Sequence, residues 1–432
     1  MFTLYNGLAV ALVVSLAPVS LALLLLRGET SSRAAAAVRR GVGRLVPSGA
    51  LRWIDWRTIA LIVGIGYAAV AGVDLLTGNY ECAGIGLTSD PVALLHSGQA
   101  FWAGGSPFLV GDCGVTTEIP YGLAAIGVNA VGSLGGLAGI AAAWGLVAVA
   151  VLPLVWYATP EPDRRYVTLF VALLPIYFPL VADQIDGASN AIVPVAVLAT
   201  IVLGARFGRL GELLGGFLST ARFPTLFPVV AARGGEKRWL LAGLTAIGAF
   251  ALTTLATYAR WGSGFYRVVF ESQVNRRSFS LNLYGILLDH ALLPTGTAIV
   301  VAQAGLIVGI TAVAFFLVRT PLRAAAVTLV GYALVTPFLS FSILLALVPV
   351  ALVGQRPRYW LWGVAIVGAL NYDLALTLAA WQWGVYLPTD LLDAVLTVLL
   401  VGLFAELLWR RGDDLVTATS GGPKPLSAAG SP

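Results

Sequence analysis

The sequence is poor in charged residues, cysteine and histidine. Only 11% of its 432 residues are Asp, Glu, Lys or Arg, whereas soluble domains carry about 25%. Its two cysteines and two histidines show no metal-ligand spacing, so the sequence implies neither a metal site nor a cofactor. Hydrophobic residues make up 58% of the chain, and several apolar runs reach the roughly 20 residues that span a bilayer. We therefore predict an all-α polytopic membrane protein.

The net charge of +5 comes almost entirely from arginines that lie between the apolar runs. This pattern indicates membrane topology rather than nucleic-acid binding. Residues 8–26 form the first predicted span, which we expect to be a retained anchor. Residues 27–57 carry seven arginines against two acidic residues, so this segment is expected to be cytoplasmic and the N-terminus to lie outside. Arg410 and Arg411 place the C-terminus in the cytoplasm.

The chain divides into three parts on this pattern. They are an N-terminal anchor helix with a basic cytoplasmic loop (1–57), a transmembrane domain (58–414) and a disordered tail rich in Gly, Ser and Pro (415–432). Within the domain, a shallow helix is expected up to Ser133. Conventional crossings are expected at 58–73, 137–156, 167–182, 191–203, 239–257, 298–318, 324–335, 342–353, 360–371 and 391–409.

Residues 212–233 do not fit a conventional crossing. They lie between two basic cytoplasmic clusters, so the chain must cross an even number of times. Two helices of about 10 residues would each be only about 15 Å long, which is half the hydrocarbon thickness. We predict a re-entrant helical hairpin with Arg222 at its tip. An arginine at membrane depth is a functional hypothesis by default, although a shallower hairpin would let the side chain snorkel to the surface.

The first long outer loop, residues 74–120, contains a predicted short helix. Asp90 can cap this helix, Pro91 suits its first turn, and Gly104 follows its end. The carboxylate is therefore either a simple helix cap or a catalytic base held near the membrane surface. Cys82 and Cys113 lie in the same loop, where a disulfide is expected; the alternative is two unpaired thiols.

Other polar residues are expected on the same side of the membrane. The second outer loop, from Tyr258 to about His290, carries Arg276 and Arg277 against the charge rule, so these residues either bind an anionic head group or face solvent. A tight polar turn is expected between the crossings at 167–182 and 191–203. Possible substrate-binding residues, each with a purely structural alternative, are His96, Asp183, Asp186, Asn190, Gln273 and Asn275.

Taken in chain order, these stretches resemble the polyprenyl-phosphate-dependent mannosyltransferases of the C-type integral-membrane glycosyltransferase superfamily. The resemblance covers about residues 55–360 and depends on the order of the motifs. The family has Lys where this chain has Arg222, and an extra span precedes the core. The similar stretches are Asp90 with Ala100–Phe108, Ile119-Pro120-Tyr121, Asp186–Asn190, Arg222-Phe223-Pro224, Gln273–Ser278 and Thr336–Ser340.

The resemblance implies a bundle of about 11–13 transmembrane or re-entrant helices, with amphipathic helices in the first outer loop. It also implies inverting transfer of a mannose-like hexose from a polyprenyl-phosphate donor to a hydroxyl of a glycan, lipid or protein acceptor at the outer face of the cell membrane. Asp90 would be the base, and Arg222, Arg276 and Arg277 would bind the donor phosphate. No divalent metal is implied. The alternatives are a lipid-linked saccharide transporter or flippase, which would favour internal repeats, and a non-catalytic subunit of the same fold.

Overall fold

The structure is a computed structural model. The residues that it describes are 55–77, 90–112, 115–119, 121–159, 161, 164–172, 190–232, 239–271, 282–283, 286–287, 292, 297–318, 320–336, 347, 349–351, 364, 367 and 389–409. In chain order, the described elements are α3 (Trp56–Thr77), α4 (Asp90–Trp102), β1 (Leu109–Asp112), β2 (Val115–Glu118), α5 (Leu123–Ser133), α6 (Gly136–Ala158), α7 (Arg164–Ala172), α9 (Ile192–Phe207), α10 (Arg209–Ser219), the 3-10 turn η3 (Phe223–Thr225), α11 (Leu226–Ala231), α12 (Trp239–Tyr266), the π-helical turn η4 (Arg267–Glu271), α15 (Thr297–Leu317), α16 (Pro321–Val335) and α19 (Thr389–Trp409).

The described part of the chain is mostly helical and strongly apolar. Four of its helices are long and apolar enough to cross a membrane: α6, the stretch Leu240–Val269 that runs from α12 into η4, α15 and α19. Shorter apolar helices lie within α3, α5, α9 and α16. The prediction of a helical membrane protein is thus confirmed at this level.

Most predicted crossings coincide with a helix to within a few residues. In chain order, these helices are α3 for 58–73, α6 for 137–156, α9 for 191–203, α15 for 298–318, α16 for 324–335 and α19 for 391–409. The first part of 167–182 lies on α7. Several predicted segments lie outside the described residues. They are the remainder of the crossing at 167–182, the anchor at 8–26, most of the crossings at 342–353 and 360–371, and the tail from 415.

Two sequence predictions are wrong. Tyr258 does not open a loop, because α12 continues to Tyr266 and passes directly into η4. Gly262 adopts a positive φ of 52°, a conformation that glycine tolerates, and forms a kink at which two helical stretches of α12 join. The purely helical prediction also missed an antiparallel hairpin, in which β1 pairs with β2 and Leu109 faces Glu118. Its residues include Val115-Thr116-Thr117, and β-branched side chains favour strands.

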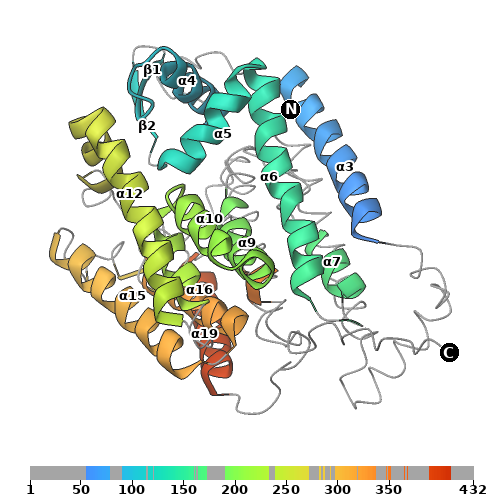
Figure 1. The fold of residues 1–432 in the computed structure, drawn as a ribbon, viewed down its shortest axis with the longest axis vertical. Helices are drawn as coiled ribbons and strands as arrows, with labels where there is room; N and C mark the ends of the chain where they lie inside the picture. The colour runs from blue at the N-terminus through green and yellow to red at the C-terminus, as the bar shows by residue number, and fades with distance from the viewer. Residues whose placement is uncertain are drawn as a thin grey trace, which may run out of the picture.

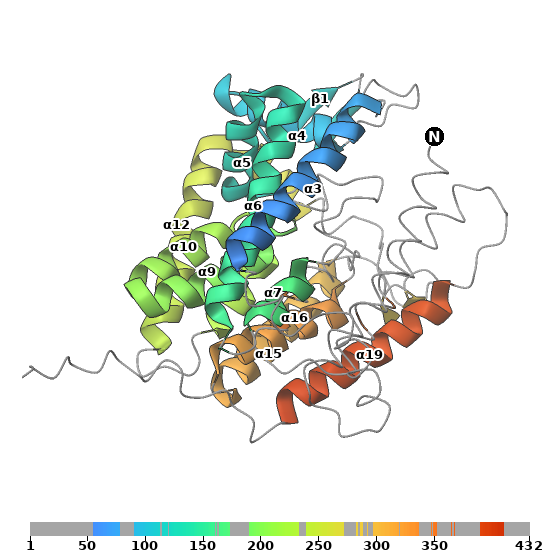
Figure 2. The same ribbon diagram turned by 90° about the vertical axis from the view of Figure 1, so that its right-hand side faces the viewer.

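The bundle has two distinct ends (Figure 1). At one end, α4, α5 and the β-hairpin form a layer near the end of α12. At the opposite end, Trp56 of α3 contacts Tyr157 of α6, with ring centroids 6.2 Å apart. Figure 2 shows α3 lying across α6, with α12 and α19 on opposite sides of the bundle. The layer of α4, α5 and the β-hairpin is called the α4–α5 layer below.

Candidate functional site

The predicted pair of short helices is present. α10 and α11 are joined through the turn at Ala221–Arg222 and η3. α10 packs its buried glycines closely against neighbouring helices: a Cβ atom added at Gly215 would lie 1.9 Å from Oγ1 of Thr200, and one at Gly216 would lie 2.2 Å from the carbonyl oxygen of Ala246. The two short helices and the turn that joins them are confirmed, whereas their re-entrant course in a membrane stays a prediction.

The tip of this hairpin is docked on the chain that leads into α5. The amide of Gly122 donates to the carbonyl oxygen of Ala221 at 3.3 Å, and the amide of Ala124 donates to Oγ1 of Thr220 at 3.2 Å. A Cβ atom at residue 122 would lie 1.8 Å from the carbonyl oxygen of Thr220. Only glycine allows the two backbones to approach this closely, so Gly122 fixes where the tip lies.

Arg222 is half-buried at the tip and contacts the segment that leads into α5. Its Nη2 atom donates to the phenolic oxygen of Tyr121 at 3.2 Å, and the guanidinium carbon lies 4.7 Å from the centroid of the same ring. The tip and the segment before α5 thus meet at one guanidinium.

A row of aromatic rings connects this point to the α4–α5 layer. Ring centroids are 5.7 Å apart for Phe108 and Trp261, 5.1 Å for Phe108 and Phe265, and 6.2 Å for Phe223 and Phe265. Phe223 directly follows Arg222. Aromatic pairs at these separations contribute beyond the area that they bury, so the tip of the two short helices and the α4–α5 layer form one packed unit.

The C-terminal end of α12 binds the turn that follows α4. Nε1 of Trp261 donates to the carbonyl oxygen of Gly105 at 2.8 Å, and Nη2 of Arg260 donates to that of Gly104 at 3.3 Å. Gly104 has a positive φ of 75°, which explains why the helix ends just before it. The polar residues of α12 that suggested a loop therefore serve to hold α4.

α4 begins at Asp90, as predicted. The Asp90 side chain lies outside the described residues. Ala93, one turn later, belongs to the same buried apolar cluster as Phe265, and Phe223 packs against that cluster. The first turn of α4 and the residue next to Arg222 therefore share one cluster. Convergence of the Asp90 carboxylate and Arg222 on one substrate stays a prediction.

A buried polar chain fixes α4 against α5 and α6. Nε1 of Trp144 donates to Oδ1 of Asn129 at 3.0 Å, and Nδ2 of Asn129 donates to Oγ of Ser97 at 3.5 Å. All three side chains are buried. Nε1 of Trp102 also donates to the carbonyl oxygen of Ala130 at 2.7 Å. Sequence reasoning missed Asn129, although a single amide within an apolar run was a usable signal.

The described chain resumes at Asn282, after the predicted arginine stretch of the second outer loop. Asn282 is fully buried, and its Nδ2 donates to the carbonyl oxygens of Ala333 at 2.8 Å and Thr336 at 3.0 Å. These carbonyls lie at the end of α16. Sequence reasoning missed Asn282, because only the tertiary structure shows that it bonds to the end of this helix.

The remaining predicted site residues are only partly placed. His96 lies half-buried on α4, and Asn190 is buried at the turn that leads into α9. The residues that lie outside the described part are Asp183, Asp186, Gln273, Asn275, Arg276, Arg277 and the two cysteines, Cys82 and Cys113.

The described residues thus form a helical membrane protein in which Tyr121 holds an arginine at the tip of two short helices. A guanidinium in this setting can bind phosphate oxygens through two parallel hydrogen bonds. Within the described ranges, no three His, Cys, Asp or Glu side chains gather to hold a metal ion. Comparison of the chain with protein-family models, with curated proteins and with solved structures finds no match.

Proposed function

We propose that the protein is an inverting integral-membrane glycosyltransferase that uses a polyprenyl-phosphate hexose as its donor. The observation that carries the proposal is the Arg222 guanidinium, held by Tyr121 at the tip of two short helices in a chain of apolar helices. An arginine in such surroundings is a functional candidate by default. A phosphate that arrives from the membrane is a suitable ligand, because a guanidinium matches the geometry of phosphate oxygens.

The residues fit a single displacement step. The Asp90 carboxylate takes the proton of an acceptor hydroxyl, whose oxygen forms a bond to the anomeric carbon of the hexose. The bond between that carbon and the phosphate oxygen breaks on the opposite face, and its electron pair stays on the polyprenyl phosphate. Arg222, with Arg276 and Arg277, stabilises the negative charge that develops there. The products are the glycosylated acceptor and polyprenyl phosphate.

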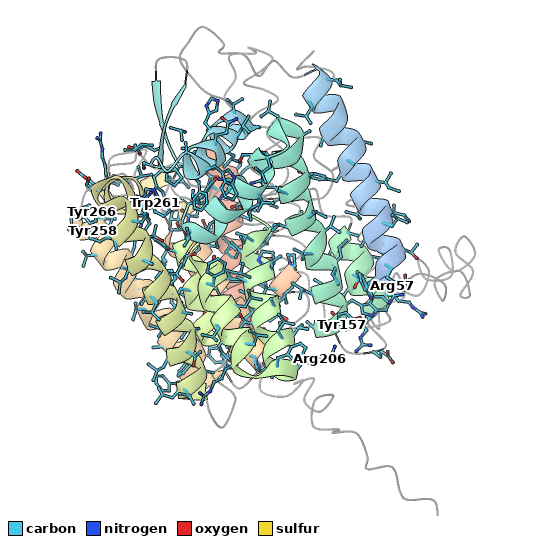
Figure 3. All side chains as sticks on the ribbon, turned by 45° about the horizontal axis from the view of Figure 1, so that its top comes forward. Arg57, Tyr157, Arg206, Tyr258, Trp261 and Tyr266 are labelled. Atoms are coloured by element: carbon cyan, nitrogen blue, oxygen red, sulfur yellow. The ribbon has the colours of Figure 1, made fainter. Side chains whose placement is uncertain are left out.

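The distribution of arginines supports placing this reaction at the outer face. Arg57 and Arg206 lie with Tyr157 at one end of the bundle, while Tyr258, Trp261 and Tyr266 lie at the other end (Figure 3). By the positive-inside rule the first end is cytoplasmic, and aromatic residues are typical of both membrane interfaces. The α4–α5 layer and Asp90 then face outward, with the C-terminus in the cytoplasm.

The test is hexose transfer in proteoliposomes. Purified protein would receive a radiolabelled polyprenyl-phosphate hexose and a cell-envelope extract of lipids and glycans as acceptors. We expect labelled product from the wild type and a large loss with Arg222→Ala. Arg206→Ala changes an exposed arginine at the opposite end and should leave turnover unchanged. Movement of intact donor across the bilayer without a labelled product would instead identify a flippase, and neither activity would favour a non-catalytic subunit.

A further inference from the structure

α9 and α10 meet at a tight corner formed by residues 205–210, all of which are exposed. Gly208 within this corner has a positive φ of 57°, and its amide donates to the carbonyl oxygen of Gly204 at 3.0 Å. A Cβ atom added at Gly211 would lie 2.3 Å from the amide nitrogen of Gly204. The first turn of α10 therefore packs directly on the last turn of α9. The segment 205–210 is called the α9–α10 corner below.

The exposed surface of the α9–α10 corner carries positive charge. Arg206 lies in the last turn of α9 and Arg209 begins α10, and both side chains are exposed. Because they are three residues apart, their Cα atoms lie within about 11 Å of each other, so their long side chains can bind one phosphate group together. Glu212, the acidic residue of α10, is only 4% exposed and belongs to the buried side of the helix.

The exposed side of α10 is apolar. Leu210, Leu213 and Phe217 are 56%, 47% and 38% exposed, and they recur at the three- and four-residue spacing of one helix face. Phe207, also exposed, precedes them at the corner, with its ring centroid 5.3 Å from the guanidinium carbon of Arg206. The buried side consists of small residues and one acid, which are Gly211, Glu212, Gly215, Gly216 and Ser219.

We propose that the α9–α10 corner binds an anionic phospholipid. Arg206 and Arg209 hold the phosphate of the head group, because guanidinium groups match the geometry of phosphate oxygens. The acyl chains lie along Leu210, Leu213 and Phe217. This inference requires only that the chain is a membrane protein, and it does not depend on the proposed function.

The length of α10 and the position of its charges favour a lipid over a soluble partner. Its 11 residues make a helix about 16 Å long, about half the hydrocarbon thickness, so the apolar side matches the acyl chains of one leaflet. Arg206 lies with Arg57 at the end of the bundle that the positive-inside rule makes cytoplasmic (Figure 3). The cytoplasmic leaflet carries anionic lipids, which attract basic residues at its surface.

The experiment measures thermal unfolding of the purified full-length protein in detergent. The added lipid is phosphatidylglycerol or phosphatidylcholine with identical acyl chains, and we expect the wild type to be stabilised more by phosphatidylglycerol. The double variant Arg206→Gln, Arg209→Gln changes two exposed residues and should fold. We expect its response to phosphatidylcholine to remain and its apparent affinity for phosphatidylglycerol to fall about 25-fold, because each arginine at a membrane surface contributes about 5-fold.

Two controls separate this site from general charge effects. Arg57→Gln removes another exposed arginine at the same end of the bundle (Figure 3), one that lies over the ring of Trp56 at 5.7 Å. This variant should keep the wild-type preference for phosphatidylglycerol. Glycerol 3-phosphate is anionic but has no acyl chains, so it should not stabilise the wild type. Equal stabilisation by glycerol 3-phosphate would identify a phosphate site and contradict a lipid site.

Three further results would overturn the inference. The first is a wild type that responds equally to the two lipids, and the second is a folded double variant that keeps the preference for phosphatidylglycerol. The third is a double variant that changes from dimer to monomer in lipid-free detergent with its lipid preference unchanged. That result would assign the α9–α10 corner to a contact with a second copy of the chain.

Discussion

The Nη2 atom of Arg222 donates a 3.2 Å hydrogen bond to the phenolic oxygen of Tyr121, 101 residues earlier in the chain. The same guanidinium lies over the tyrosine ring. One side chain thus orients the arginine both by a hydrogen bond and by its aromatic face, and both contributions can be measured separately.

Tyr121→Phe removes the hydrogen bond and keeps the ring. We expect KM for the donor to rise about 10- to 150-fold, because a hydrogen bond to a charged group contributes about 1.5–3 kcal/mol. Tyr121→Leu also removes the ring and should raise KM further, by the roughly 0.5–2 kcal/mol of a cation–π contact. Steady-state kinetics with varied donor concentration tests this order. Equal KM values in the wild type and both variants would show that Tyr121 does not position Arg222.

Gly122→Ala should separate the hairpin tip from α5, because the new Cβ atom would lie 1.8 Å from the carbonyl oxygen of Thr220. Backbone atoms must then shift, so both the melting temperature and donor turnover are expected to fall. Gly127→Ala is the matched control on α5, where a Cβ atom meets nothing within 4 Å. That variant should be neutral or slightly stabilising. Similar melting curves for the two variants would contradict the close approach at Gly122.

Asp90→Asn keeps a side-chain oxygen that can cap α4 but cannot take a proton. We expect a folded protein whose turnover falls by about 10²- to 10⁴-fold, the usual contribution of a general base. Turnover in proteoliposomes and circular dichroism of the same preparation measure the two effects. Near-wild-type turnover in a folded variant would leave Asp90 as a helix cap only.

The membrane orientation is testable by cysteine labelling in intact cells. In a background in which Cys82 and Cys113 are replaced by serine, single cysteines would be placed at Ala103 and Arg206, which are both exposed. We expect a membrane-impermeant maleimide to label Ala103→Cys but not Arg206→Cys, because the charge rule makes the arginine-rich end cytoplasmic. The reverse pattern would invert the whole topology.

Cys82 and Cys113 are predicted to form a disulfide in the first outer loop. Mass mapping of peptides prepared without a reductant should recover the two cysteines as one linked pair. In the chain-entropy model such a bond contributes about 3–4 kcal/mol to the free energy of unfolding. A reductant should therefore lower the melting temperature of the wild type but not that of a Cys82→Ser variant. Two free thiols in freshly purified protein would disprove the pairing.

The sequence by itself determined the class of the protein and the bounds of most of its helices. Long apolar runs separated by arginines predicted α3, α6, α9, α15, α16 and α19, because burial in lipid and the cost of a charge there act on local composition. The start of α4 at Asp90 followed from capping chemistry. The paired short helices around Arg222 followed from chain length, since about 20 residues between two clusters predicted to be cytoplasmic cannot cross twice.

Only the tertiary structure decided which polar groups meet across the bundle. The last turns of α12 contain Arg260 and Trp261, which read locally as a loop, yet they are helical and bond to the carbonyl oxygens of Gly104 and Gly105. Likewise, Asn282 donates to the last carbonyls of α16. These polar groups find their partners across long sequence separations, and composition and periodicity carry no information about such pairings. The helices were therefore predictable from local physics, whereas the candidate site depends on how the helices pack.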